Sequence, residues 1–249
     1  MTDRSGPAAQ AAAVLPPTEP PRSGAIVLVH GAWVGEWSWL PVEPGLRASG
    51  RAVHAVSLTG HGAMRHRSGP HVTLADHVAD VINLVETFDL RDVTLVGHSY
   101  GGRVITGAVG QLAERVTALV YLDAHTPVAP DPGQTPARVE AAAANGNMLP
   151  FPEEYRPDSA HVGGPEGVQW FTDRLMPQSF ACFTAPWLKD LPTEVRRTFV
   201  FASGYAPTRF GHYAELCRDD PAWRYHELDG PHFLMFSHQT EVVEIILDA

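Results

Sequence analysis

Short apolar runs alternate along the chain with segments of helical spacing. Such runs are typical of strands buried on both faces of a sheet. The predicted strands fall at residues 25–30, 51–58, 92–96, 116–122, 198–202 and 223–228. Helical spacing is clearest after a capping-box-like start at Thr73, where apolar residues recur at Leu74, Val78, Val81, Ile82, Val85 and Phe88. Shorter helices are expected at residues 38–48, after 102, at 212–217 and from about 240. Strands that alternate with helices predict a parallel sheet with helices packed on it.

Two parts of the chain lack this alternation. Residues 124–197 are dense in Pro, Gly and aromatic residues without clear periodicity. An insertion of this kind usually has a function, such as covering a binding or active site. We therefore expect a cap subdomain at about residues 125–196, within one α/β domain at residues 25–249. Residues 1–24 are rich in Ala and Pro but lack the basic cluster and apolar stretch of a secretory signal, so they predict a disordered arm.

Composition narrows the possible partners. The formal net charge of −10 at pH 7 argues against nucleic acid or an anionic membrane. No apolar run is long enough to cross a bilayer. The two cysteines, Cys182 and Cys217, do not make a disulfide framework, so a cytoplasmic location is expected. A loop holds His61, His66 and His71, but without an HExxH motif, a paired carboxylate or a cysteine cluster it predicts a polar loop and no metal.

The most specific motif is Gly97-His98-Ser99-Tyr100-Gly101, which follows a predicted strand and precedes a predicted helix. This is the setting of a nucleophile elbow, a tight turn that exposes a serine at its apex. So tight a turn needs neighbours without Cβ atoms, and Gly97 and Gly101 meet that need. Ser99 is therefore the candidate nucleophile, and the alternative is a glycine-rich turn that only packs a helix on the sheet.

A serine nucleophile needs a base and a site for the negative charge of the intermediate. His232 follows the final predicted strand, at the sheet edge where open α/β folds carry their chemistry, and is the best base candidate among 13 histidines. The backbone amides of Ala32 and Tyr100 are the candidate oxyanion hole. His30 and His98 are expected to make structural contacts.

These residues resemble the α/β-hydrolase superfamily, and within it the group of plant methyl esterases and hydroxynitrile lyases. The resemblance rests on residues 29–33, 97–102 and 119–124 and on His232, and it extends over nearly everything after Gly24. It implies a mostly parallel sheet of eight strands, with the cap inserted after the sixth strand. In this chain that point follows Asp123.

The triad acid departs from the usual pattern of this group. Most members place it after the seventh strand, where this chain reads Gly204-Tyr205-Ala206-Pro207-Thr208-Arg209 and offers no carboxylate. Some relatives, including zearalenone lactonase, place the acid at the end of the sixth strand, the position of Asp123. Asp123 is therefore the expected acid. Its alternative role is to cap backbone amides, and Asp229 and Glu227 are weaker candidates.

The resemblance also bears on the reaction. Hydroxynitrile lyases carry a threonine and a lysine where this chain has Gly31 and Phe233, so the residues favour an esterase-type site. The expected substrate is a small, largely apolar or aromatic ester or lactone, cleaved through an acyl-enzyme without a cofactor. A cofactor-free lyase, cyclase or decarboxylase, or a ligand receptor with a vestigial triad, remains the alternative. A monomer and a homodimer are both compatible with the sequence. The expected substrate-binding residues are aromatic: Trp33, Trp170, Phe183 and Trp187.

Overall fold

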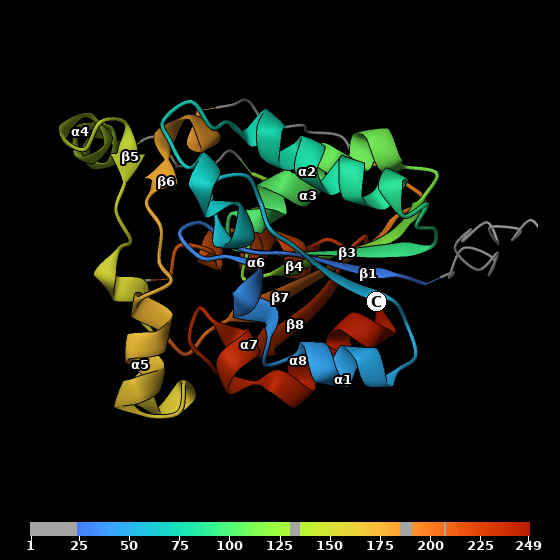
Figure 1. Ribbon diagram of the computed structural model, residues 1–249. Coiled ribbons are helices and arrows are strands. Elements are labelled where there is room, and N and C mark those ends of the chain that lie inside the picture. The colour runs from blue at the N-terminus through green and yellow to red at the C-terminus, as the bar shows by residue number, and fades with distance from the viewer. Residues whose placement is uncertain (1–23, 130–134, 185–190, 207) are drawn as a thin grey trace, which may run out of the picture.

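A six-stranded parallel sheet forms the centre of the protein (Figure 1). The computed structural model describes residues 24–129, 135–184, 191–206 and 208–249. The strands lie in the order β2-β1-β3-β4-β7-β8, and each neighbouring pair is parallel. The strands are β1 (Ile26–Val29), β2 (Val53–Val56), β3 (Val93–His98), β4 (Val116–Leu122), β7 (Arg196–Ala202) and β8 (Arg224–Leu228). The strand order reverses between β1 and β3, and open α/β sheets bind ligands beyond the carboxyl ends of the strands at such a point.

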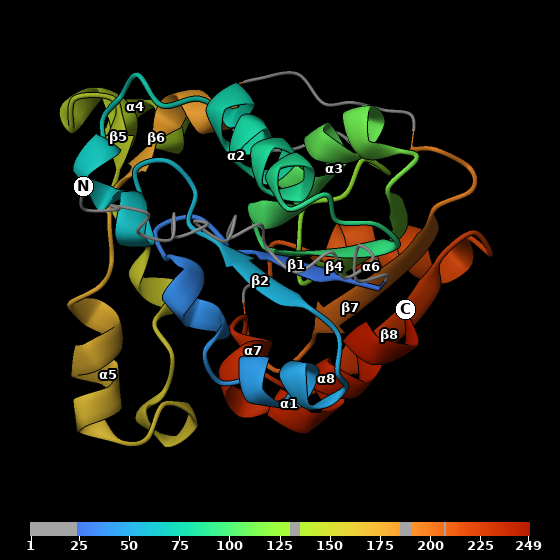
Figure 2. The same ribbon diagram turned by 45° about the vertical axis from the view of Figure 1, so that its right-hand side comes forward.

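Helices cover both faces of this sheet (Figures 1 and 2). Helices α2 (Leu74–Thr87) and α3 (Gly101–Leu112) pack together on one face, and α1 (Glu43–Ala48), α7 (Leu234–Ser237) and α8 (Gln239–Asp248) lie on the other. Helix α6 (Gly211–Asp219) packs against β7 and β8. Helix α2 begins with the predicted capping box, in which Thr73 and Asp76 each accept a bond from the other's backbone amide. Within the described ranges, the helices are all too short or too polar to cross a membrane.

The predicted alternation of strands and helices is confirmed, with one helix divided. All six predicted strand segments are strands of the main sheet. The helix expected at residues 38–48 is instead a 3₁₀ turn, η1 (Glu36–Trp39), followed by the short helix α1. Pro41 lies between the two, and a proline inside a helix removes a hydrogen bond and clashes with the preceding turn.

The expected number of eight strands is not met among the described residues, where the main sheet has six. The cap was expected after the sixth strand, whereas the long insertion here follows β4, the fourth in chain order. Residues 1–23, which are all but the last residue of the predicted disordered arm, lie outside the described residues.

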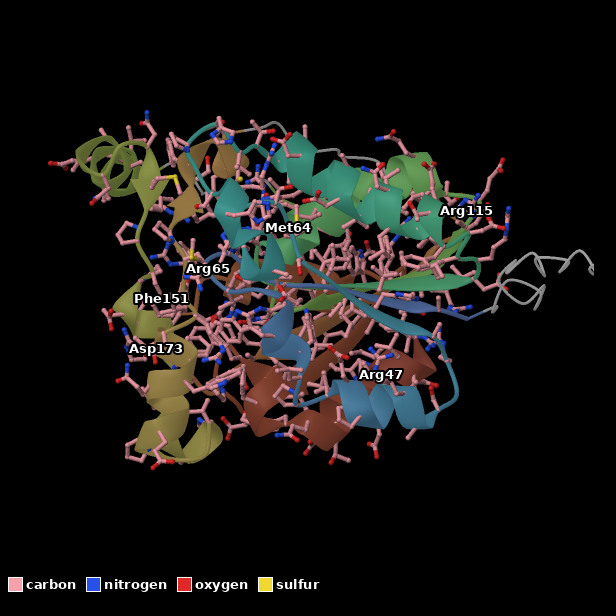
Figure 3. The ribbon with its side chains drawn as sticks, in the orientation of Figure 1. Arg47, Met64, Arg65, Arg115, Phe151 and Asp173 are labelled. Carbon is pink, nitrogen blue, oxygen red and sulfur yellow. The ribbon has the colours of Figure 1, made fainter. Side chains whose placement is uncertain are left out.

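The segment between β4 and β7, residues 123–195, lies against one end of the sheet (Figure 1). We call it the insertion. It contains α4 (Pro136–Ala144), α5 (Pro165–Thr172), the 3₁₀ turns η3 (Glu153–Tyr155), η4 (Ser159–His161) and η5 (Phe180–Phe183), and a small antiparallel pair, β5 (Met148–Leu149) and β6 (Gln178–Ser179). Figure 3 places Phe151 at this end of the molecule and Arg115 at the opposite end. The end of the sheet covered by the insertion is the one at which β1, β3 and β4 finish.

Candidate active site

Ser99 occupies the apex of a tight turn between β3 and α3. Its backbone has a φ of 53°, in the left-handed region that a serine rarely adopts. The glycines beside it are required by close backbone approach: a Cβ on Gly97 would lie 2.6 Å from the Gly101 carbonyl oxygen, and one on Gly101 would lie 2.5 Å from the Val29 carbonyl oxygen. The Ser99 side chain, in a residue 7% exposed, lines a pocket. This geometry is that of a nucleophile elbow.

Three adjacent strand ends carry left-handed backbone. Trp33 after β1, Ser99 after β3 and Asp123 after β4 have φ values of 65°, 53° and 42°. The parallel register pairs Val29 with Gly97 and His98 with Leu122, so these three strands finish at the same level. Each residue of this kind costs about 1–3 kcal/mol, and such residues cluster at functional sites. The strained positions therefore mark one edge of the sheet.

Asp123 and His232 form a buried pair at this edge. The Nδ1 atom of His232 lies 2.6 Å from Oδ2 of Asp123, and both side chains are almost inaccessible. Glu227, one of the weaker candidates, instead accepts a bond from Arg218 at the surface. A carboxylate at Nδ1 fixes the tautomer that leaves Nε2 able to accept a proton. The structure thus places Asp123, rather than Asp229 or Glu227, against the imidazole.

Tyr205 is a second partner of this carboxylate that the sequence did not indicate. Its hydroxyl donates to Oδ2 of Asp123 at 2.7 Å and lies 3.4 Å from Nδ1 of His232, while the amide of Ala202 donates to Oδ1 at 3.3 Å. Tyr205 belongs to the loop after β7 where most relatives were expected to place the acid. The only signal in the sequence was a hydroxyl in a loop without a carboxylate.

Burial shifts both groups of the pair toward their neutral forms. Desolvation raises the pKa of Asp123, and the hydrogen bonds from Tyr205 and Ala202 oppose that rise. Desolvation lowers the pKa of His232, and the positive charge of Arg209 adds to the effect. A neutral imidazole is the form that removes a proton, so His232 is ready to act as a base at neutral pH.

Two further histidines hold the backbone of the site. The Nε2 atom of His98 lies 2.9 Å from the carbonyl oxygen of His232 and fixes the loop that carries this residue. His30 binds the Gly31 carbonyl through Nδ1 and accepts from the amide of Leu58 through Nε2. Both side chains are fully buried. They make the structural contacts that were expected of them.

The remaining buried histidines extend from His30 under the site. His61 packs between His30 and His77, with ring centroids 5.6 and 5.8 Å apart. His77 binds the Tyr100 hydroxyl through Nδ1 and the Thr59 carbonyl through Nε2. Burial lowers the pKa of His61 to about 3 and that of His77 to about 4. Among the described residues no three His, Cys, Asp or Glu side chains are grouped so that they could hold a metal ion.

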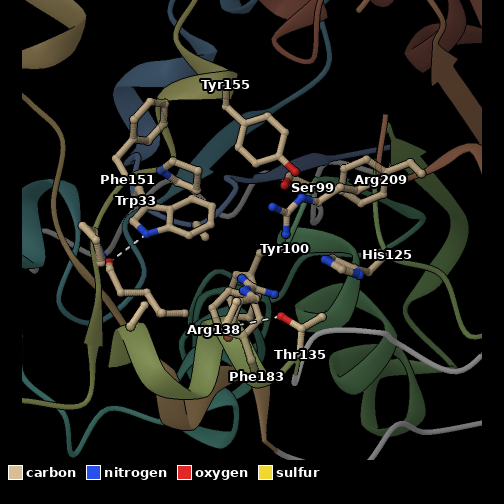
Figure 4. A pocket seen from close by; sticks show the side chains of 17 residues that line it. Trp33, Ser99, Tyr100, His125, Thr135, Arg138, Phe151, Tyr155, Phe183 and Arg209 are labelled. Carbon is tan, nitrogen blue, oxygen red and sulfur yellow. Dashed lines mark hydrogen bonds between the residues drawn. The ribbon is translucent and has the colours of Figure 1, made fainter. Parts of the chain in front are cut away.

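The pocket beside Ser99 has a volume of ≈ 530 Å³ (Figure 4). Ala32 and Tyr100, the expected oxyanion-hole residues, line it next to Ser99. Its walls are mainly aromatic, from Trp33, Phe151, Tyr155, Phe183 and Phe210. Two arginines that the sequence did not single out, Arg138 and Arg209, also line it.

Two of the four aromatic residues predicted to bind substrate, Trp33 and Phe183, lie in this pocket. Trp170 does not line it, because its ring packs edge-on against Trp37 of η1 at 5.2 Å and carries the guanidinium of Arg174 at 4.2 Å. Trp187 lies outside the described residues. The spacing of aromatic residues in an irregular segment did not show which of them face inward.

Known proteins resemble this chain in sequence and in structure. Residues 26–245 match the model of the alpha/beta hydrolase family. A carbendazim hydrolyzing esterase from Nocardioides sp. (strain SG-4G) is 35% identical in an alignment of 237 residues that covers 88% of this chain and 96% of that protein. Salicylic acid-binding protein 2 from Nicotiana tabacum is 36% identical over 102 residues, 41% of this chain and 39% of that protein. The crystal structure of a methylesterase from Arabidopsis superposes with a TM-score of 0.72 at 23% identity, over 91% of this chain and 98% of the other. This chain belongs to the alpha/beta hydrolase family.

Proposed function

We propose that Ser99, His232 and Asp123 are the catalytic triad of this carboxylic ester hydrolase. The observation that carries the proposal is the 2.6 Å contact between Asp123 and His232 at the sheet edge where the strained Ser99 lines the pocket. Esterases among its relatives support hydrolysis of a small ester. The aromatic walls of the pocket favour an apolar or aromatic substrate.

In the first half of the reaction Ser99 Oγ attacks the ester carbonyl. His232 accepts the hydroxyl proton on Nε2 and passes it to the departing alcohol, while Asp123 stabilises the cationic imidazole. The carbonyl oxygen becomes an oxyanion that accepts bonds from the backbone amides of Ala32 and Tyr100. Breaking the ester bond leaves an acyl group on Ser99.

In the second half a water molecule replaces the alcohol. His232 removes a proton from the water, and the resulting hydroxide attacks the acyl-enzyme carbonyl. The same two amides hold the second oxyanion. Its collapse releases the carboxylic acid and returns the proton from His232 to Ser99. Each proton taken up in this scheme is given back, so the mechanism requires no cofactor.

Tyr100 is suited to a fixed oxyanion-hole donor. Its amide follows the nucleophile at the beginning of α3, and its side chain is anchored beneath the site by the 2.8 Å contact between its hydroxyl and His77. Preorganised donors stabilise charge without reorganising during the reaction. The buried histidines thus support the chemistry without contacting the substrate.

The test is the Ser99→Ala variant, assayed with a short-chain 4-nitrophenyl ester and with a fluorophosphonate label. Hydrolysis and labelling should both fall by at least about a thousandfold, with the melting temperature nearly unchanged. Ser159→Ala, a change at an exposed serine of η4, is the matched control and should keep full activity. Labelling of Ser99 without turnover of any ester would instead favour the lyase or receptor alternative. Activity retained in Ser99→Ala would exclude the elbow serine as nucleophile.

Four narrower points belong to the same proposal. A lactone is a cyclic ester and would follow the same steps, so lactones are substrates to include in the assay. The insertion acts as the cap that selects among them, because it supplies Phe151, Tyr155 and Phe183 to the pocket.

Cys182 and Cys217 are both buried and unpaired, which favours a reducing compartment such as the cytoplasm. A monomer or homodimer is in keeping with a pocket lined by one chain.

A further inference from the structure

Tyr155 brings a hydroxyl group to the pocket that the proposed mechanism does not use. The residue ends η3 of the insertion, is 7% exposed and lines the pocket together with Ser99. Within the described part of the chain its hydroxyl has no hydrogen-bond partner, whereas the hydroxyl of Tyr205 is bonded to Asp123. Figure 4 shows the hydroxyl end of Tyr155 pointing toward Ser99. A substrate in the pocket can therefore accept a hydrogen bond from this group.

Packing on several sides fixes the direction of the Tyr155 ring. It lies against the imidazole of His232, with ring centroids 4.7 Å apart, and against the rings of Trp33 and Tyr205, each at 6.4 Å. The guanidinium carbon of Arg209 lies 5.7 Å from the centroid of the same ring. A ring confined in this way has little freedom left to lose when its hydroxyl binds a substrate. The hydroxyl is thus a preorganised donor.

The turn that carries Tyr155 is itself held on two sides. Arg156, the next residue, donates a hydrogen bond to the hydroxyl of Thr172 in α5. Glu154, the preceding residue, accepts a bond at 3.0 Å from Arg209, which belongs to the loop after β7. One contact joins η3 to the rest of the insertion, and the other joins it to a loop of the main sheet. The position of η3 over the site therefore depends on both parts of the fold.

Burial keeps the hydroxyl of Tyr155 protonated. Desolvation raises the pKa of this phenol to about 12, and the negative charges of Glu154 and Asp123 act in the same direction, against the positive charge of Arg209. A phenol that stays protonated at neutral pH donates a hydrogen bond without giving up its proton. Tyr155 is therefore suited to stabilise developing negative charge, and it is not a second base.

The position of Tyr155 indicates which substrate atom receives this bond. In the proposed mechanism the amides of Ala32 and Tyr100 hold the carbonyl oxygen, whereas the alcohol oxygen leaves toward Nε2 of His232. Tyr155 packs on the imidazole of His232 and points toward Ser99. Its hydroxyl therefore lies on the side of the pocket from which the alcohol departs.

We propose that Tyr155 is a catalytic residue that donates a hydrogen bond to the alcohol oxygen of the ester as that oxygen leaves. When the C–O bond breaks, its electron pair stays on the alcohol oxygen, which takes the proton from Nε2 of His232. The Tyr155 proton stays on the phenol, and its hydrogen bond stabilises the negative charge on the leaving oxygen until that proton arrives. The bond matters most for esters of weakly acidic alcohols, such as simple alkyl esters. This inference rests on the proposed ester hydrolysis and adds a residue to the same site.

The test compares three butyrate esters whose leaving groups are progressively less acidic, namely 4-nitrophenyl, phenyl and ethyl butyrate. Tyr155→Phe keeps the ring and removes only the hydroxyl. It should lower kcat/KM for ethyl butyrate by about 10- to 100-fold, the usual effect of losing a hydrogen bond to a charged group, and that for the 4-nitrophenyl ester by less than about 3-fold. The difference arises because 4-nitrophenolate spreads its charge over the ring. For ethyl butyrate the loss should fall on kcat, with KM nearly unchanged.

Tyr225→Phe is the matched control, because the Tyr225 hydroxyl is bonded to Arg218 and Glu227 and does not line the pocket. It should leave the rates for all three esters unchanged. Hydrolysis of 4-nitrophenyl butyrate by the wild type, and its loss in Ser99→Ala, report the proposed function by itself, so a failure of that function is seen separately.

Three results would overturn the proposal. An equal loss on all three esters in Tyr155→Phe would mean that the hydroxyl supports the structure or binds the carbonyl oxygen. A rise in KM alone would mean that it binds the substrate only before the reaction. Unchanged rates for all three esters would mean that it makes no contact with the reacting atoms.

Discussion

We predict that the buried histidines make the free energy of unfolding of this protein steeply dependent on pH. His30, His61, His77 and His98 are each at most 2% exposed, and burial lowers the pKa of every one of them below the usual value of 6.5. In the unfolded chain they recover that usual value and bind protons as the pH falls below it. A lowered pKa in the folded state therefore stabilises the fold above pH 6.5, and this contribution is lost on acidification.

The magnitude follows from proton binding by the unfolded state. Between about pH 7 and about pH 5.5, a histidine with an unfolded pKa of 6.5 that stays neutral when folded reduces the free energy of unfolding by about 1 kcal/mol. Four such residues together reduce it by roughly 4 kcal/mol, a large part of the 5–15 kcal/mol typical of a domain. Asp123 and His232 are left out because the raised pKa of one and the lowered pKa of the other oppose each other.

The measurement is the free energy of unfolding from urea titrations at several pH values between about 7 and 5.5. The His61→Leu variant measures the contribution of a single histidine to this pH dependence. The substitution removes no hydrogen bond of good geometry within the described chain, because neither ring nitrogen of His61 makes one. The loss of unfolding free energy over this pH range should be smaller in His61→Leu than in the wild type by about 1 kcal/mol. His66→Leu, at an exposed position of the same loop, is the control and should change nothing. A wild-type loss below about 1 kcal/mol would refute the reasoning.

The remaining predictions concern Asp123, His232 and the side chains that contact them. Asp123→Asn should lower kcat/KM by about 10⁴ with little loss of folding, because the imidazole loses its orienting charge; activity near the wild-type level would exclude Asp123 as the acid. Tyr205→Phe should lower kcat/KM by about 10-fold, since it removes one donor to that carboxylate; an unchanged rate would mean that the hydroxyl only packs. The acid limb of kcat/KM should lie below pH 6.5, because burial and Arg209 lower the pKa of His232. Arg209→Gln should move this limb to higher pH, and a fixed limb would contradict the electrostatic argument.

The sequence predicted the parts of the site that backbone geometry dictates. Ser99 could be placed because glycines flank it in a turn between a predicted strand and a predicted helix. Asp123 could be brought to the same edge because it ends a strand parallel to the elbow strand. Both arguments depend on strand ends, which the apolar pattern locates well.

Side-chain direction in irregular segments could not be predicted in this way. The loop after β7 was known to lack a carboxylate, but nothing in its sequence showed that Tyr205 turns inward to Asp123. Arg138 lies on a short helix of weak amphipathic character, so its direction depends on how the insertion packs on the sheet. Trp170 was expected in the pocket and packs elsewhere for the same reason.

The left-handed backbone at Ser99 and Asp123 has a consequence for attempts to make the enzyme more heat-resistant. A glycine relieves such strain, so Ser99→Gly should raise the melting temperature by about 2–4 °C for each kcal/mol released. Selection of a random library for folded yield at high temperature would then enrich proteins that have lost Ser99 or Asp123, the proposed nucleophile and acid. The sequence that gives the most heat-resistant fold therefore differs from the sequence that gives the most heat-resistant active enzyme. A selection for thermal stability has to include an assay of turnover in every round.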